Sequence, residues 1–130
     1  MKIGQLSQVS GCSIQTIRYY EKEGLLNPPN RSEGNFRLYD VKAQKQLEFV
    51  KHCRSLGIPL SDIRTLLDLK NSPEESCITV NDLISNQLEL VNKRIKELRE
   101  LKTELQIMQK ACSTDSTVET CGIMKTLEPS

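Results

Sequence analysis

The stretch VNDLISNQLELVNKRIKELRELKTELQIMQKA, residues 80–111, decides the architecture of this chain. Apolar residues recur in it at steps of four and three, the pattern of a coiled-coil seam. The seam residues are Ile84, Leu88, Val91, Ile95, Leu98 and Leu105. At about 1.5 Å per residue, the stretch predicts a helical rod of roughly 48 Å. A chain of 130 residues has little other mass to cover such a rod, so we expect the helix to pair with a second copy of itself. The alternative is a helix that folds back on its own N-terminal part.

Three of the five cysteines flank this helix. Cys77 lies just before it, Cys112 lies just after it, and Cys121 follows across a short polar loop. In one straight helix, Cys77 and Cys112 of the same chain would be roughly 50 Å apart and could not share a ligand. In an antiparallel dimer, the start of one helix lies beside the end of the other. The cysteine positions therefore predict an antiparallel dimer, in which Cys77 of one subunit meets Cys112 and Cys121 of its partner.

Three thiolates are suited to a soft or borderline ion, and the residues leave mercury, lead, cadmium and zinc open. Zinc usually takes four nitrogen or sulfur ligands, and the segment between Cys112 and Cys121 contains neither His nor another Cys. The competing interpretation is a thiol redox sensor, in which these cysteines form a disulfide across the dimer. We expect Cys12 and Cys53 to be small buried residues rather than ligands, and His52 to pack or hydrogen-bond near its helix end.

Charge is distributed unevenly along the chain. The formal net charge is +1, but residues 1–54 carry +4 and the remaining residues carry −3, which indicates a polyanionic partner for the N-terminal part. No signal peptide, membrane-spanning run or lipidation motif is found, so we expect a cytoplasmic protein without a membrane partner. With no nucleophile–base pair and a single His, we do not expect an enzyme.

The first residues predict a helix-turn-helix motif. Helical patterns cover residues 2–10 and 14–23. Gly11 separates the two predicted helices, and Ser13 is a good N-cap for the second one. On that second helix, the side chains expected to point outward are Gln15, Thr16, Arg18 and Tyr19. Gln and Thr can read base edges, whereas Arg and Tyr can hold phosphates, so this helix is the candidate DNA-reading element.

A basic hairpin is predicted directly after this motif. Residues 31–39 indicate two short strands around a turn at 33–35, and Arg31, Arg37 and Tyr39 decorate it, as in a wing that lies along DNA. Further helices are expected over 41–55, capped by Asp40, and over about 60–70. The predicted fold class is all-α with a small β-wing: a winged helix-turn-helix head followed by a long dimerisation helix. Its expected segments are a head and connector at 1–70, a hinge with Cys77 at 71–79, the dimerisation helix at 80–111, and a metal-binding loop and tail at 112–130.

Several short motifs resemble those of the MerR family of bacterial transcription regulators. They are IQTIRYYE at 14–21, GLL at 24–26, RLY at 37–39 and HCRSLG at 52–57, followed by the long helix flanked by cysteines. The resemblance implies a homodimer with an antiparallel coiled coil that binds double-stranded promoter DNA together with RNA polymerase. In that family, the effector makes the dimer bend and untwist the DNA, which converts repression into activation. Matched residue by residue, the resemblance implies contacts with the DNA backbone from both elements. The residues are Arg18, Tyr19 and Tyr20 on the second helix, and Arg37 and Tyr39 on the wing.

The hinge region narrows the resemblance further. The segment PEESC at 73–77 and the residues at 52–66 look most similar to the cadmium- and lead-responsive branch of the family. The resemblance thus implies Cd(II) or Pb(II) as the effector and heavy-metal resistance genes as targets. The mercury-responsive branch has the same cysteine pattern, so Hg(II) is the second choice. Zn(II) ranks below it because zinc-responsive relatives tend to carry an additional Cys or His in the loop.

Overall fold

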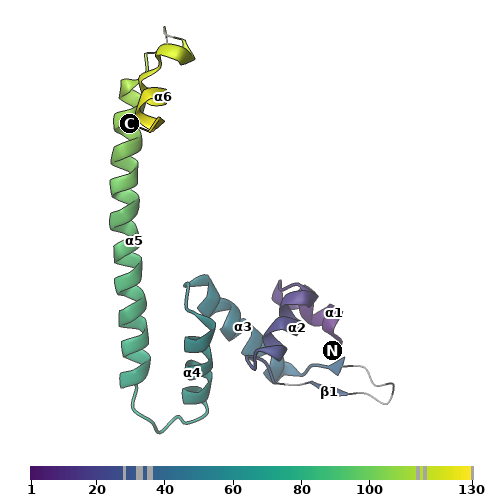
Figure 1. The fold of residues 1–130 in the computed structure, drawn as a ribbon. Helices are drawn as coiled ribbons and strands as arrows, with labels where there is room; N and C mark the ends of the chain where they lie inside the picture. Colours follow the sequence, from purple (N-terminus) through teal and green to yellow (C-terminus); the bar gives the residue numbers. More distant parts are fainter. Residues whose placement is uncertain (28, 32–33, 35–36, 114, 116, 130) are drawn as a thin grey trace. The chain divides into compact units, whose positions relative to one another are not determined.

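The computed structural model describes the chain except residues 28, 32–33, 35–36, 114, 116 and 130, and it leaves out the side chains of residues 30 and 31. The described chain divides into two compact units, Met1–Ile84 and Ser85–Ser130. Figure 1 shows the elements of both units.

The first unit begins with the predicted helix-turn-helix. Helix α1 spans Ile3–Ser10 and helix α2 spans Ile14–Lys22. Gly11 ends α1 with a φ of 73°, a left-handed conformation that favours glycine. Ser13 caps α2 as predicted, because the Thr16 backbone N–H donates to its hydroxyl oxygen at 3.1 Å. The Lys51 ammonium donates to the Ser10 carbonyl at 2.7 Å and so anchors this turn to the rest of the unit.

The predicted hairpin follows α2. Strand β1 (Asn30–Arg31) pairs antiparallel with strand β2 (Arg37–Leu38), with Asn30 opposite Leu38 and Arg31 opposite Arg37. The predicted turn at 33–35 includes Glu33 and Asn35, which lie outside the described residues. Where the structure describes it, the wing therefore has the predicted pairing.

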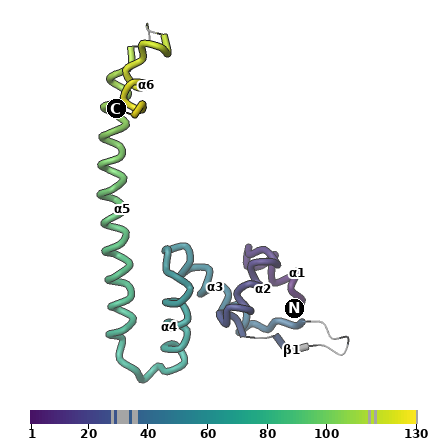
Figure 2. The backbone as a smooth tube through the Cα atoms, in the orientation of Figure 1, coloured from purple at the N-terminus to yellow at the C-terminus, as the bar shows by residue number. Residues whose placement is uncertain are grey.

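Two further helices complete the head. Helix α3 spans Val41–Ser55, and Asp40 caps it as predicted by accepting a hydrogen bond from the Ala43 N–H at 2.8 Å. Helix α4 spans Leu60–Lys70 and is separated from α3 by a turn in which Gly57 has a φ of 77°. Figure 2 traces these helices from the wing to the end of α4.

Two apolar clusters hold the first unit together. The first cluster joins α1, α2, the wing and α3; its largest buried members are Leu6, Ile17, Leu26, Tyr39 and Leu47. The second joins α3 and α4 with the segment after α2; its members include Leu25, Val50, Ile58, Ile63 and Leu66. Cys12 lies in the first cluster and Cys53 in the second, each 8% exposed, so the prediction that both are buried is confirmed.

Helix α5 spans Ile78–Ala111 as one uninterrupted helix of 34 residues, two residues longer at its start than predicted. Near this start, Val80 and Leu83 pack against the second cluster of the head. Farther along, the six seam residues are exposed, from 37% for Val91 to 63% for Leu98. An exposed apolar stripe of this length is the surface that a second helix would cover.

The second unit contains the end of α5, a short 3-10 helix (Val118–Thr120) and helix α6 (Gly122–Leu127). Figures 1 and 2 both show α6 turning back beside the end of α5. Among the residues that the structure describes, every helix is too short or too polar to span a lipid bilayer.

Candidate metal-binding and DNA-binding sites

Two of the three predicted ligands lie together in the second unit. Cys112 directly follows α5 and Cys121 directly precedes α6, and their sulfur atoms are 3.7 Å apart. Gly122 makes this approach possible, because a Cβ atom there would lie only 2.3 Å from the Ala111 carbonyl oxygen. The sequence does not predict this role of Gly122, and its only signal for it is a glycine next to a candidate ligand.

The pKa values of the two thiols are shifted in opposite directions. Backbone N–H groups of Met124 and Ile123 donate to the Cys121 sulfur and lower the pKa of that thiol. The hydrogen bond shared with Cys121 raises the pKa of Cys112. Cys121 is therefore the first of the pair to ionise, and a metal ion must displace the proton that Cys112 retains.

The spacing of the sulfur pair fits a single metal ion. Two sulfurs bound at about 2.3 Å to a tetrahedral ion lie about 3.8 Å apart. The 3.7 Å separation of Cys112 and Cys121 is close to this value. A larger soft ion needs somewhat wider spacing, which small side-chain rotations supply. The pair is thus a two-sulfur fragment that can receive a thiophilic ion with little rearrangement.

The third predicted ligand belongs to the first unit. Cys77 is exposed, immediately precedes α5, and lines a cavity of about 250 Å³ with Phe49, Leu66 and Pro73 among its other walls. Throughout the described part of the chain, no three His, Cys, Asp or Glu side chains gather closely enough to hold a metal ion. The structure therefore brings Cys112 and Cys121 together within one chain but does not add Cys77 to them.

Helix α2 presents most of the predicted DNA-reading side chains to solvent. Gln15, Arg18 and Tyr19 are exposed, whereas Thr16 is half-buried and its hydroxyl accepts a hydrogen bond from the Ser13 hydroxyl at 2.8 Å. Tyr20 is half-buried and packs against both apolar clusters, so its ring is mostly occupied with the core. DNA contacts by these residues stay predictions.

The wing differs from the prediction at Tyr39. Its side chain is only 2% exposed, and its hydroxyl donates to the Glu21 carboxylate. Arg37, which is about one-third exposed, forms an ion pair with the same carboxylate at 3.0 Å. Tyr39 is thus a core residue that ties the wing to α2, which revises the prediction that it contacts the DNA backbone. The side chain of Arg31 lies outside the described residues, and its role stays a prediction.

Glu21 links α2 to the wing, a contact that the sequence did not predict. Its carboxylate accepts hydrogen bonds from both the Tyr39 hydroxyl and the Arg37 guanidinium, and so ties the helix to the wing. Glu23 plays a similar part at the end of α2, because the Arg64 guanidinium donates to its carboxylate at 2.6 Å and to its carbonyl at 2.7 Å. The only sequence signal for either was an acidic residue within a basic head.

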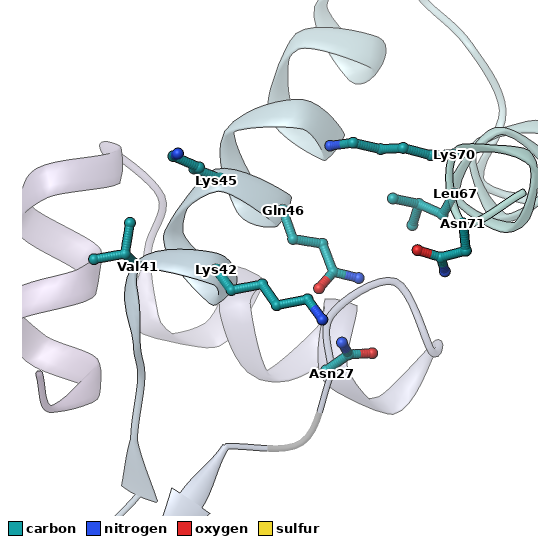
Figure 3. Close-up of a pocket in the computed structure, with 8 residues that line it drawn as sticks. All are labelled: Asn27, Val41, Lys42, Lys45, Gln46, Leu67, Lys70 and Asn71. Carbon is teal, nitrogen blue, oxygen red and sulfur yellow. The ribbon is translucent and has the colours of Figure 1, made fainter. Parts of the chain in front are cut away.

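A separate cavity of about 520 Å³ lies between α3, α4 and the segment after α2. Figure 3 shows its lining, which includes Lys42, Lys45 and Lys70 but no cysteine and none of the predicted DNA contacts. Protonated lysines do not ligate soft metal ions. This cavity is therefore not a candidate for the metal site, which leaves the sulfur pair after α5.

Comparison with known proteins identifies the family of the chain. Residues 1–70 match the family model described as MerR HTH family regulatory protein, and residues 44–108 match the model described as MerR, DNA binding. A ZntR-homologous transcriptional regulator of Haemophilus influenzae is 40% identical over 88% of this chain and 86% of its own length. The mercuric resistance operon regulatory protein of Bacillus cereus is 30% identical over 97% of this chain and 96% of its own.

A solved structure with high similarity is that of the transcription regulator PbrR691 from Ralstonia metallidurans CH34 in complex with lead(II). It is 43% identical, has a TM-score of 0.87, and covers 98% of this chain and 99% of its own. Its similarity extends over both the head and the long C-terminal helix. The chain therefore belongs to the MerR family of helix-turn-helix transcriptional regulators, and it is not an enzyme.

Proposed function

We propose that this protein is a cytoplasmic, metal-responsive regulator that binds promoter DNA as a homodimer and responds to Pb(II) or Cd(II). The observation that carries the proposal is the pair of thiols, 3.7 Å apart, at the end of a helix with an exposed apolar stripe. Two relatives support a thiophilic ion: one is named for mercuric resistance, and a structurally similar regulator was solved with lead(II).

The third sulfur comes from the second subunit. Helix α5 has 34 residues, so its two ends are about 51 Å apart. Cys77 precedes this helix, and the sulfur pair follows it. When two such helices pair antiparallel through the seam, the Cys77 of each subunit comes next to the sulfur pair of the other. The dimer then holds two identical sites of three thiolates each.

Three thiolates favour Pb(II) and Cd(II) as effectors. The lone pair of Pb(II) fills the open side of a three-sulfur site, and Cd(II) completes its coordination with a water or another oxygen ligand. Hg(II) also suits three thiolates and is the second candidate, since a 30% identical relative is named for mercuric resistance. Zn(II) is the last candidate, because structural zinc sites usually have four protein ligands.

The response to metal takes place on DNA. The head at residues 1–70 binds the promoter through α2 and the wing, the hinge at 71–79 carries Cys77, and residues 112–130 carry the sulfur pair and the tail. Metal binding joins the hinge of one subunit to the tail of the other and so changes the relative orientation of the two heads. The bound promoter is distorted, RNA polymerase then initiates on it, and heavy-metal resistance genes are expressed.

Mixed dimers test whether the site spans two subunits. A Cys77→Ser subunit paired with a Cys112→Ser subunit has one site lacking two sulfurs and one site with all three. Under anaerobic, reducing conditions, the mixed dimer should bind one Pb(II) with ultraviolet thiolate-to-lead charge transfer. Each homodimeric variant should lack this three-sulfur signal, and the wild type should bind two ions.

Two other outcomes would contradict the proposal. A mixed dimer without charge transfer, alongside a wild type that has it, would mean that each site forms within one chain. Wild-type protein that binds no ion when reduced, yet activates transcription after oxidation, would support the redox-sensor alternative. Transcription from the native promoter with Pb(II), Cd(II), Hg(II) and Zn(II) in competition then identifies the effector.

A further inference from the structure

The Cys112–Cys121 pair has a second chemistry besides metal binding. Its sulfur atoms lie 3.7 Å apart, and a disulfide bond requires about 2.05 Å, a difference that side-chain rotation can close. Both thiols are free and half-buried, so a small oxidant has access to them. We infer that a peroxide oxidises this pair to a disulfide within one chain, which removes two metal ligands at once and makes the metal response sensitive to redox state. The effect on the metal response rests on the proposed function. The oxidation itself does not, because it needs no metal.

The other thiols are poorer candidates for the same reaction. Cys12 and Cys53 are each 8% exposed and lie in different apolar clusters. Burial also raises the pKa of the Cys53 thiol, and it is the thiolate that reacts with oxidants. Cys77 is exposed, but the structure shows it in a different unit from the sulfur pair. The pair already in contact within one chain should therefore react before a disulfide forms between subunits.

The reaction proceeds in two balanced steps. One sulfur of the pair attacks hydrogen peroxide: an S–O bond forms, the O–O bond breaks, and the departing hydroxide takes up the thiol proton as water. The second sulfur then attacks this sulfenic acid: the S–S bond forms, the S–O bond breaks, and a second water leaves with the remaining thiol proton. Two thiols lose two electrons, and one peroxide gains them.

Oxidation leaves each proposed metal site with Cys77 alone. One thiolate cannot replace three in holding a soft ion, so the oxidised regulator should not respond to metal until a dithiol reductant restores the pair. Conversely, a bound ion engages both sulfur atoms and protects them from peroxide. Metal binding and oxidation are thus mutually exclusive states of the same two residues.

The test uses the full-length, metal-free, reduced protein and one equivalent of hydrogen peroxide. Digestion at glutamate cleaves after Glu119 and so places Cys112 and Cys121 on different peptides. We expect mass spectrometry to find these peptides joined, with a loss of two alkylation labels per chain, while a non-reducing gel shows only monomers. Lead(II) charge transfer should disappear in the oxidised protein and return with dithiothreitol. Saturation with lead(II) before peroxide should preserve both labels.

Two variants separate this inference from the proposed function. Cys77→Ser lacks the third sulfur of the proposed metal site but retains the pair, so it should form the disulfide with wild-type yield. Cys112→Ser should form none. Chains cross-linked into dimers, or a pair that keeps both labels after peroxide, would overturn the inference even if wild-type protein binds lead(II). Failure of reduced wild-type protein to bind lead(II) would instead overturn the proposed function, with the disulfide still formed.

Discussion

At the scale of single residues, Glu21 connects α2 with the wing. The pKa of Tyr39 is the property through which this connection can be measured. Burial, together with the hydrogen bond to Glu21, raises the pKa of Tyr39 to about 12. Between pH 10 and 12, Tyr39 would lose its proton in the unfolded chain but keep it in the folded one. The free energy of unfolding should therefore fall as pH rises through this window, by at most about 3 kcal/mol from this residue. Below pH 10 this contribution is fully present.

Tyr39→Phe isolates this effect. At neutral pH the variant should lose about 1 kcal/mol of stability, since Glu21 loses one hydrogen bond and keeps its ion pair with Arg37. Between pH 10 and 12 its stability should fall less than that of the wild type. Tyr19→Phe is the matched control, because Tyr19 is 46% exposed, and its pH dependence should follow the wild type. Urea denaturation at fixed protein concentration measures all three, and parallel pH profiles for the wild type and Tyr39→Phe would contradict the argument.

At the scale of elements, the sequence predicts the features that depend on neighbouring residues alone, such as helix bounds and helix caps. The bounds of α3 and its Asp40 cap, the Ser13 cap of α2 and the uninterrupted course of α5 all follow from periodicity and capping residues. Features that depend on contacts between distant segments could not be predicted. The burial of Tyr39 requires Glu21 eighteen residues earlier, and the sulfur pair requires the close approach that Gly122 permits.

The exposed stripe of α5 leads to a prediction at the same scale. Leu88 is 58% exposed in the single chain, and in the proposed dimer it lies in the seam. Leu88→Asp would place a carboxylate in an apolar interface, so we expect the dimer to dissociate, and DNA binding and the three-sulfur lead(II) signal to be lost together. Asn86→Asp adds the same charge on the opposite face of α5 and should leave the dimer intact. Sedimentation equilibrium measures the outcome, and a Leu88→Asp protein that remains dimeric would place the interface elsewhere.

At the scale of the whole molecule, a metal site shared by two subunits must couple metal binding to dimer stability. An ion that binds only when Cys77 of one subunit faces the sulfur pair of the other stabilises the dimer by mass action. Lead(II) should therefore slow the exchange of subunits between differently labelled wild-type dimers, as measured by energy transfer between the labels. In Cys77→Ser, the pair after α5 still offers two sulfurs to the ion within one chain, but nothing links that ion to the second subunit. Its exchange rate should be insensitive to lead(II). Because the seam alone holds the metal-free dimer, wild type and variant should exchange at the same rate before metal is added. Equal slowing of both proteins by lead(II) would show that Cys77 is not the link between the two subunits, and the coupling from hinge to tail would then have to be abandoned.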